Sequence, residues 1–506
     1  MAWSLEIHHI DVGQGDATFI VARDVNQVTG AVLFERSALI DGGRLNQAVN
    51  IDNYITGLVP QVPQLDVMVA THYDQDHFNG LRGLLNLNVN TYNNTIIFDR
   101  GEQGNLTVKR RSNGGYNVTV SNREPDYTRY LNAIASQGAR TRVTQLVSST
   151  TALTQGLQAA GWQDANWIVG KELLWTNGDG NPDPTLYGGN APNPPLPVPA
   201  PAGNIPWPAG VPAPGNPGGP PAIICIAANQ HILQPNGGTV QIQGGLLAPP
   251  QRVKNEKSLV FLVKFNNFLY YIGADIETTQ EDDTINNANG IMHYFINAMG
   301  VPNATPVHAM KCSHHGSGES SSQAFINTLD PRAAFISCGT NNGHGANLPN
   351  WPTGHPQQRV LNDLEAQPNL QNYYMTADRH NDDFCRRMNT GTGAYPFAYT
   401  PKAIVAGAWG HIAVPPNPPA PPGPSPCAGN WPNDGAAGPI YGDIILDVSE
   451  PQSGWTIPPG GAAPVLAAGG AANFDVTYTH PPLHPGFVVQ LQGNLLPVPT
   501  QTTNGH

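Results

Sequence analysis

Four side chains that commonly bind metal ions lie within six positions of one short segment. The segment THYDQDHFNG spans residues 71–80 and carries His72, Asp74, Asp76 and His77. Imidazole nitrogens and carboxylate oxygens are ligands that zinc and manganese take in proteins. Asp and His also cap turns and helices, but capping alone does not require two of each in the spacing HxDxDH. We therefore interpret the segment as a metal-binding loop.

The residues before this loop predict a buried strand that would hold the loop in place. LDVMVATH, residues 65–72, is largely apolar, and a loop at the end of a strand presents its ligands from a rigid scaffold. Upstream, we expect strands at 5–12 and 17–24 around a GQGD turn, a further strand that ends at Asp41, and a helix at 45–58.

The second half of the chain alternates strands and helices. SLVFLVKFNNFLYYIGAD, residues 258–275, predicts two strands joined by an Asn-Asn turn, with Asp275 at the end of the second strand. The stretch HAMKCSHHGS follows at 308–317. We expect further helices and a strand at 126–137, 291–299, 321–329 and 333–339. This alternation is typical of an α/β protein.

Proline and glycine interrupt this pattern twice. Residues 177–222 are rich in Pro, Gly and Asn, which cannot pack a core and predict a surface insertion. Residues 415–426, PPNPPAPPGPSP, form a polyproline-type segment. Late strands are expected at 442–448 and 473–480, where they would finish a sheet edge or form a small β appendage.

Five motifs in a fixed order carry a resemblance to a known family. They are DVGQGDA, LIDGG, THYDQDHFNG, SLVFLV…YIGAD and KCSHHGS. Together they resemble the metallo-β-lactamase fold and, more narrowly, the soluble hydrolase domain of ComEC-type DNA-uptake proteins and their stand-alone relatives. The resemblance covers about residues 5–385. It implies an αββα sandwich over 1–400 with the Pro/Gly-rich insertion, followed by a Pro-rich, β-containing C-terminal extension over 401–506.

The resemblance implies a site for two metal ions. His72, Asp74, Asp76 and His77 match the family's ligand loop, and Asp275 matches the carboxylate that bridges the two metals.

Further matches lie outside the loop. One or both of His314 and His315 match a late His ligand. Asp41 matches the carboxylate that orients a ligand His. Support near the site, rather than ligation, is expected of the first-turn residues Asp11, Gln14 and Asp16.

Two positions differ from most of the superfamily, and the first of them, Asp74, matches the ComEC-like branch. Asp74 stands where most of the superfamily has a His, and its anionic oxygen favours harder ions such as manganese. The superfamily often has another His ligand between the loop and the bridging Asp, and His231 is the one His in that interval. It is either a ligand or an ordinary surface or core His. If it is not a ligand, the metal site that holds His72 and Asp74 is short of ligands.

A second His-containing region follows the late motif. His355 matches a His-Pro before a helix in relatives, where it would protonate a leaving group, or it is simply a loop residue. Further candidates for substrate contact are Asn341, Asn342 and His344.

The resemblance favours a metal-dependent hydrolase. Two divalent cations, zinc or manganese, would lower the pKa of a water that Asp76 and Asp275 position. We favour phosphodiester hydrolysis, in nucleic acid or a small nucleotide. Carbonyl substrates such as a lactone, thioester or β-lactam are the alternative, because one fold performs both chemistries. A second alternative is a non-enzymatic scaffold whose Pro-rich segments bind partners.

Composition narrows the class of partner. The formal net charge of −12 argues against a broad basic surface for long nucleic acid. The five Cys form no CxxC pair, so a cysteine zinc site is not indicated. The N-terminus lacks a signal-peptide pattern and no apolar run is long enough to span a membrane, so we expect a cytoplasmic protein. Some basic residues lie close together in the sequence and could guide a nucleic-acid strand or simply face solvent. They are Lys109, Arg110, Arg111, Arg129, Arg140 and Arg142.

Overall fold

The computed structural model describes most of the chain up to residue 376 and several later strands. The described residues are 2–26, 28–58, 62, 64–87, 92, 94–101, 105–110, 116–121, 125–135, 142–144, 162–164, 168–176, 219–234, 237–242, 255–265, 268–298, 307–339, 355–376 and the C-terminal strands named below. Outside them lie most of the insertion 177–222, the segment 415–426, the Asn-Asn turn 266–267, residues 341–354, Arg111 and Arg140.

The first sheet is mixed and contains the N-terminal strands. Strands β1 (Ala2–His9), β2 (Thr18–Val25) and β3 (Val32–Ile40) pair antiparallel. From β3 onward neighbouring strands pair parallel, in the order β3, β4 (Val67–Ala70), β5 (Ile96–Asp99), β8 (Arg142–Thr144) and β9 (Trp162–Asp164). The strands predicted at 5–12, 17–24 and 65–72 are therefore present.

C-terminal strands complete this sheet on its other side. Strand β19 (Asp443–Ser449) pairs antiparallel with β1, and the order continues through β22 (Asn473–Thr479), β23 (Val488–Gln492) and β24 (Gln501–Thr502). Of the two alternatives for the late strands, the structure thus has the one in which they extend a sheet edge. The division of the chain at residue 400 stays a prediction.

The second sheet is also mixed. Its order is β12 (Thr239–Gln241), β11 (His231–Leu233), β10 (Ala222–Ala228), β13 (Val260–Phe265), β14 (Phe268–Ile272), β15 (Ala309–Lys311), β16 (Ala333–Ile336), β17 (Asn372–Met375) and β18 (Ala403–Val405). Pairing is antiparallel up to β14 and parallel from there to β18. Two short hairpins stand apart, β6 (Asn105–Arg110) with β7 (Tyr116–Ser121) and β20 (Trp455–Thr456) with β21 (Val465–Leu466).

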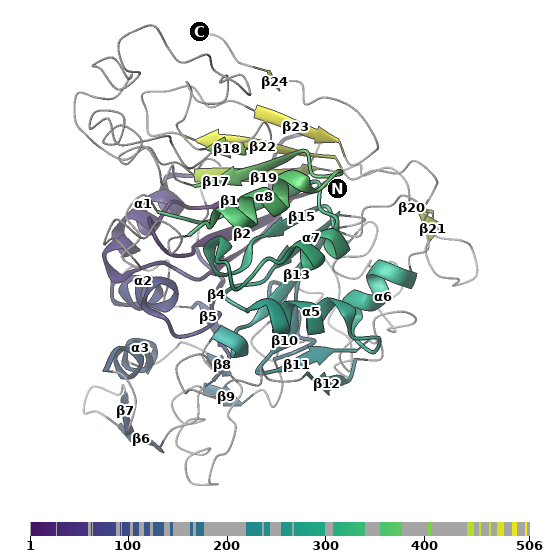
Figure 1. Cartoon of the computed structure of the whole chain (residues 1–506). Coiled ribbons are helices and arrows are strands. Elements are labelled where there is room, and N and C mark those ends of the chain that lie inside the picture. The colour runs from purple at the N-terminus through teal and green to yellow at the C-terminus, as the bar shows by residue number, and fades with distance from the viewer. Residues whose placement is uncertain are drawn as a thin grey trace, which may run out of the picture.

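Helices cover the outer faces of the two sheets (Figure 1). The first sheet carries α1 (Ala48–Gly57), α2 (Gln75–Asn86) and α3 (Pro125–Ala135). The second carries α5 (Thr278–Asn286), α6 (Ile291–Ala298), α7 (Gln323–Leu329) and α8 (Gln358–Ala366). This arrangement confirms the α/β class. Among the described residues no helix has the length and apolar character needed to cross a membrane.

Alternating side chains divide each central strand between two cores. In β2, for example, Ile20 contributes to the core between the two sheets, whereas Phe19 and Val21 pack toward α1 and α2. Successive side chains of a strand point to opposite faces, so the period of two fixes this division. The two sheets are thereby packed face to face, and the loops at their strand ends can meet.

Candidate metal centre

A buried cluster of carboxylates and imidazoles lies where loops from both sheets meet. Ligand atoms of Asp16, His77, Asp275 and His315 all lie within 4.8 Å of one another, and all four residues are buried. Asp16 and His77 come from the first half of the chain, from the β1–β2 turn and the first turn of α2. Asp275 and His315 follow β14 and β15 of the second sheet.

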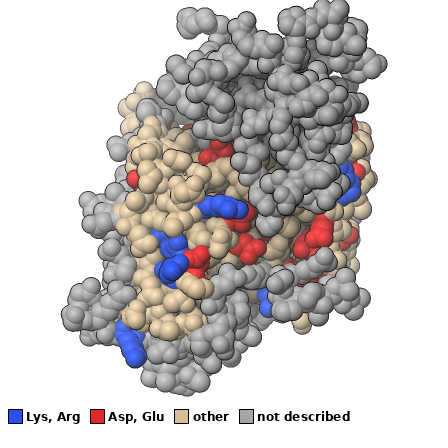
Figure 2. Space-filling model, turned by 60° about the vertical axis from the view of Figure 1, so that its left-hand side comes forward, with Lys and Arg blue, Asp and Glu red and all other residues tan. Residues whose placement is uncertain are grey.

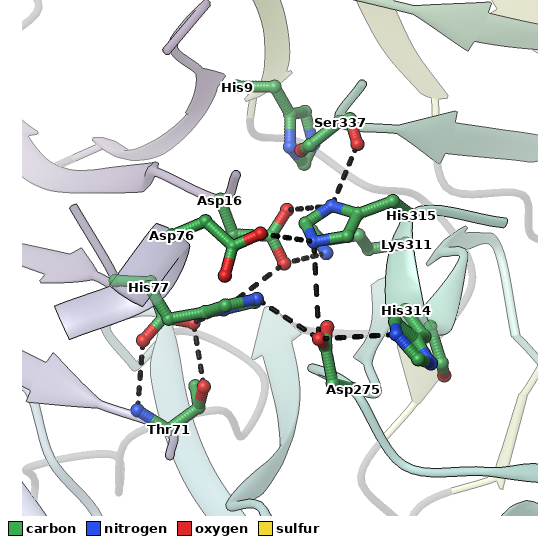
Figure 3. Close-up of polar contacts among 12 residues, drawn as sticks. His9, Asp16, Thr71, Asp76, His77, Asp275, Lys311, His314, His315 and Ser337 are labelled. Atoms are coloured by element: carbon green, nitrogen blue, oxygen red, sulfur yellow. Dashed lines mark hydrogen bonds and ion pairs between the residues drawn. The ribbon is translucent and has the colours of Figure 1, made fainter. Parts of the chain in front are cut away.

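Asp275 is at the centre of the imidazoles. Its Oδ2 lies 3.1 Å from His77 Nε2 and 3.5 Å from His72 Nε2. The Nε2 atoms of His314 and His315 are each 3.9 Å from the same oxygen. Figure 3 shows the rings of His77, His314 and His315 turned toward this carboxylate. One oxygen is therefore shared by four rings from two loops.

Asp41 holds the outward-facing nitrogens of the His77 and His72 imidazoles. His77 Nδ1 lies 2.9 Å from Asp41 Oδ2. The hydroxyl of Thr71 donates to the same oxygen at 2.7 Å and lies 3.0 Å from His72 Nδ1. Since the Thr71 proton goes to Asp41, Thr71 Oγ1 accepts from the Nδ1–H of His72. Both rings then present the lone pair of Nε2 to the centre.

The His315 imidazole is held by the second sheet. His315 Nδ1 donates to the backbone carbonyl of Ser337 at 3.0 Å, which leaves its Nε2 facing inward. That Nε2 is 3.9 Å from Asp76 Oδ2. His314 and His315 both adopt left-handed backbone conformations, with φ of 50° and 54°. Left-handed conformations are unfavourable for non-glycine residues and concentrate at functional sites.

The inward-facing atoms fit a metal ion. Nε2 of His72, His77 and His315 and Oδ1 of Asp275 are buried and make no hydrogen bond within the described part of the chain. A buried polar atom without a partner is costly, and native proteins rarely tolerate several in one place. Lone pairs of nitrogen and anionic oxygen that converge in this way are the donor set of a divalent cation such as zinc or manganese.

Charges within the cluster shift its protonation. Burial alone would raise the pKa of Asp275, but the surrounding imidazoles, His77 foremost, hold it well below its usual range. Burial alone would lower the pKa of His77, whereas Asp275 and Asp41 raise it well above its ordinary value. Burial also opposes ionisation of Asp16, yet the Lys311 ammonium and His315 keep its pKa low. Asp16 and Asp275 are therefore anionic, and a cation that bound His77 Nε2 would release the proton that the raised pKa of His77 retains.

The structure brings most of the predicted residues together but not all of them. His72, Asp76, His77, Asp275, His314 and His315 lie around one point, with Asp41 behind them. Asp74 is the residue that precedes α2, is half-buried, and is not part of the four-residue cluster. The roles of all these residues as metal ligands stay predictions.

His355 and His231 differ in position. His355 lies beside the cluster, with its ring centre 5.1 Å from that of His314. His231 is in β11, where its Nδ1 lies 3.0 Å from the carbonyl of Asn229, and it is not in the four-residue cluster. The candidates Asn341, Asn342 and His344 lie outside the described residues.

Sequence reasoning missed three contacts of the cluster. It gave no role to Thr71, to Ser337, or to Lys311, which forms a buried ion pair with Asp16. Thr71 is the first residue of the metal-binding loop and Lys311 is the first of the KCSHHGS motif, so their positions were a signal. The Ser337 contact is made by a backbone carbonyl, which no residue type reveals.

Comparisons with known proteins give one partial relative. No model of a known protein family matches the chain. Over 135 residues, 27% of this chain, the sequence is 30% identical to ComE operon protein 3 of Bacillus subtilis (strain 168). The chain spans 13% of the length of that protein.

Solved structures add little. A mutant of the CmlA beta-hydroxylase matches with a TM-score of 0.25 at 10% identity, over 77% of this chain and 51% of that chain. CmlA, a diiron beta-hydroxylase from Streptomyces venezuelae, matches with a TM-score of 0.23 at 10% identity, over 77% of this chain and 52% of that chain. Likenesses at these scores carry no argument here. The partial sequence match does, and it makes this chain a homologue of ComE operon protein 3 over that stretch, which confirms the ComEC-like resemblance of the motifs.

Proposed function

We propose that the chain is a metal-dependent hydrolase of the metallo-β-lactamase fold that cleaves phosphodiester bonds in nucleic acid or a small nucleotide. The observation that carries the proposal is the convergence on Asp275 of three buried Nε2 atoms, those of His72, His77 and His315, for which the described residues offer no hydrogen bond. The order of layers, helices on two packed sheets, supports the fold.

In this proposal the chain's own residues hold two divalent cations, zinc or manganese, and orient the reactants. Asp275 lies between the imidazoles and would contact both cations, and Asp76 faces His315 from the opposite side. Bound cations would supply a water of lowered pKa and neutralise charge on the attacked phosphoryl group. Asp41 and Ser337 keep the ligand imidazoles in one tautomer, so the site is preorganised.

Substrate would approach on the side of His314 and His355. The His314 side chain is 20% exposed, whereas those of His72 and His77 are fully buried. In this proposal His355, whose ring centre lies 5.1 Å from that of His314, would donate a proton to the leaving group.

The surface favours a short or small substrate. On the face shown in Figure 2, acidic and basic side chains of the described residues lie close to one another, without a broad basic area. Affinity for a long duplex depends on many phosphate contacts from Lys and Arg. A metal centre can hold a single phosphodiester without such a surface.

Hydrolysis of bis(p-nitrophenyl) phosphate tests the proposal. Metal-stripped protein is assayed alone and after zinc or manganese is restored, beside Asp275→Ala and the matched control Asp363→Asn. Asp363 is an α8 carboxylate that pairs with Arg359 and not with the cluster. We expect turnover that requires metal, is lost in Asp275→Ala and persists in Asp363→Asn.

The opposite result would redirect the proposal. Tight metal binding without turnover of any phosphodiester would refute phosphodiester hydrolysis. Lactone, thioester and β-lactam substrates would then be assayed with the same variants.

A further inference from the structure

A buried ion pair crosses between the two halves of the cluster. Lys311 Nζ, at the end of β15, contacts Asp16 Oδ2, and the two side chains are 1% and 3% exposed. Asp16 belongs to the β1–β2 turn of the first sheet, whereas Lys311 leads into the segment that carries His315. The pair therefore joins a turn from one sheet to the ligand segment of the other.

The Asp16 carboxylate approaches the imidazoles from their outer side. Its Oδ1 is 3.5 Å from His315 Nδ1, and its Oδ2 is 3.7 Å from His77 Nδ1. These are the nitrogens that Ser337 and Asp41 hold, whereas the Nε2 atoms face Asp275. Figure 3 shows the contacts of the Asp16 carboxylate with Lys311 and with the rings of His77 and His315.

The backbone of Asp16 is fixed to the ligand loop. Its N–H donates to the carbonyl of Asp76 at 3.1 Å, and its carbonyl accepts from Gly43 at 2.7 Å. Gly15, with φ of +149°, makes this close approach possible, since a Cβ there would lie 2.5 Å from the Asp76 carbonyl oxygen. Asp16 cannot shift without moving the segment that carries Asp76.

The positive charge of Lys311 argues against Asp16 as a metal ligand. By distance alone Asp16 belongs to the four-residue cluster and could be a third carboxylate ligand. Asp16 Oδ2 pairs with the Lys311 ammonium, so a cation bound at the other oxygen would lie beside that buried ammonium. Two positive charges so close together repel strongly in a buried site of low dielectric constant.

We propose that Asp16 and Lys311 act together as positioning residues, which hold the imidazoles of His77 and His315 from outside the metal centre, and that Asp16 is not a metal ligand. This inference rests on the proposed metal-dependent function. In this inference the carboxylate ligands of the metal centre are Asp76 and Asp275. Lys311 holds Asp16 in place.

Cobalt(II) binding tests the assignment without any substrate. Metal-stripped wild type, Asp16→Asn, Lys311→Met and the double variant are titrated with cobalt(II), and equivalents, affinity and the visible absorption maxima are recorded. Asp66→Asn is the matched control, because Asp66 is a buried carboxylate paired with Arg36 at 2.8 Å. Thermal unfolding of each variant verifies that it folds.

We expect Asp16→Asn to keep the equivalents and absorption maxima of wild type while its affinity falls about 10- to 100-fold, the range for groups that orient ligands. Asp66→Asn should keep wild-type affinity even where its stability falls. The double variant should bind within about threefold of Asp16→Asn, since Lys311 acts only through Asp16 and the two effects are then not additive.

Two results would overturn the inference. Loss of an equivalent or a shift of the absorption maxima in Asp16→Asn would make Asp16 a ligand. Wild-type affinity in both Asp16→Asn and Lys311→Met would leave the pair no role at the centre. A wild-type chain that binds no cobalt(II), zinc or manganese would instead refute the proposed function itself, so the two failures are distinguishable.

Discussion

Asp41 serves two imidazoles at once, and the second only through a hydroxyl. Its Oδ2 contacts His77 Nδ1 directly and reaches His72 through Thr71 Oγ1. Asp41 directly follows β3 and has a φ of 59°. This position brings its carboxylate within reach of both rings. One carboxylate thus sets the tautomers of two candidate ligands on the same segment.

Thr71→Val should weaken metal binding, whereas Thr71→Ser should not. Valine has the shape of threonine but removes the hydroxyl that joins His72 to Asp41, so the His72 ring loses its fixed orientation. We expect the affinity for zinc to fall about 10-fold or more. A competition titration with a chromogenic chelator measures this, and equal affinities of the two variants would contradict the role of Thr71.

At this scale the sequence predicted the ligand types and missed their connections. His72 and His77 were recognisable from the crowding of 71–80, and Asp275 from its place at a strand end. The contact between Asp16 and Lys311 joins residues 295 positions apart, and residue types carry no information on such a distance. Asp74 precedes α2 and is half-buried, and its role as a ligand stays a prediction.

Helix α2 is fixed to the turn that carries Asp41 by the close approach of two glycines. A Cβ on Gly80 would lie 1.6 Å from the carbonyl oxygen of Gly42, which is backbone and cannot move aside. The helix begins one residue before Asp76, so this contact also determines where Asp76 and His77 lie.

Gly80→Ala should therefore destabilise the chain and weaken metal binding together. We expect a loss in unfolding free energy at or above the upper end of the about 1–3 kcal/mol typical of overpacked sites. Gly57→Ala in α1 is the control, because no atom lies within 4 Å of a Cβ there. Urea denaturation and zinc titration provide the readouts, and a Gly80→Ala protein as stable as Gly57→Ala would exclude this account of the contact.

A buried glutamate fastens the segment 168–176 to strand β10. Glu172 accepts backbone N–H groups of Leu174, Trp175 and Ile223 at 2.9, 2.7 and 3.2 Å. Burial nevertheless raises the pKa of Glu172 from 4.5 to about 7. The folded chain therefore holds a proton that the unfolded chain releases between these two pH values.

Stability should consequently fall as pH rises from 4.5 to 7, and Glu172→Gln should remove that part of the fall. Between these values the folded state binds more protons at Glu172 than the unfolded state, so the contribution is full below 4.5 and lost above 7. At about 1.4 kcal/mol per pH unit, the difference between wild type and variant should change by about 3 kcal/mol. Urea denaturation across this range measures it, and parallel pH profiles would contradict the assignment.

Elements were easier to predict than their partners. The strands at 5–12 and 258–275 and the helix at 126–137 follow from period and turn residues, which are local properties. The pairing of β19 with β1 is not local, because some 430 residues separate the strands and many partners suit an apolar strand edge. Helix α2 was missed because the ligand loop itself forms its first turn.

The whole molecule builds its centre from two sheets. The first sheet supplies His72, Asp76 and His77, and the second supplies Asp275 and His315. The four residues of the buried cluster come from both sides, Asp16 and His77 from the first half of the chain and Asp275 and His315 from the second. Packing of the two sheets therefore brings the cluster together.

Equilibrium dialysis of the metal-stripped chain against zinc and manganese tests the central claim most directly. Wild type and Asp363→Asn should retain up to two equivalents of metal per chain, and Asp275→Ala should lose them, because Asp275 Oδ2 is the atom common to every ligand imidazole. Retention of less than one equivalent by wild type, or equal retention by Asp275→Ala, would show that this buried cluster is not a metal centre.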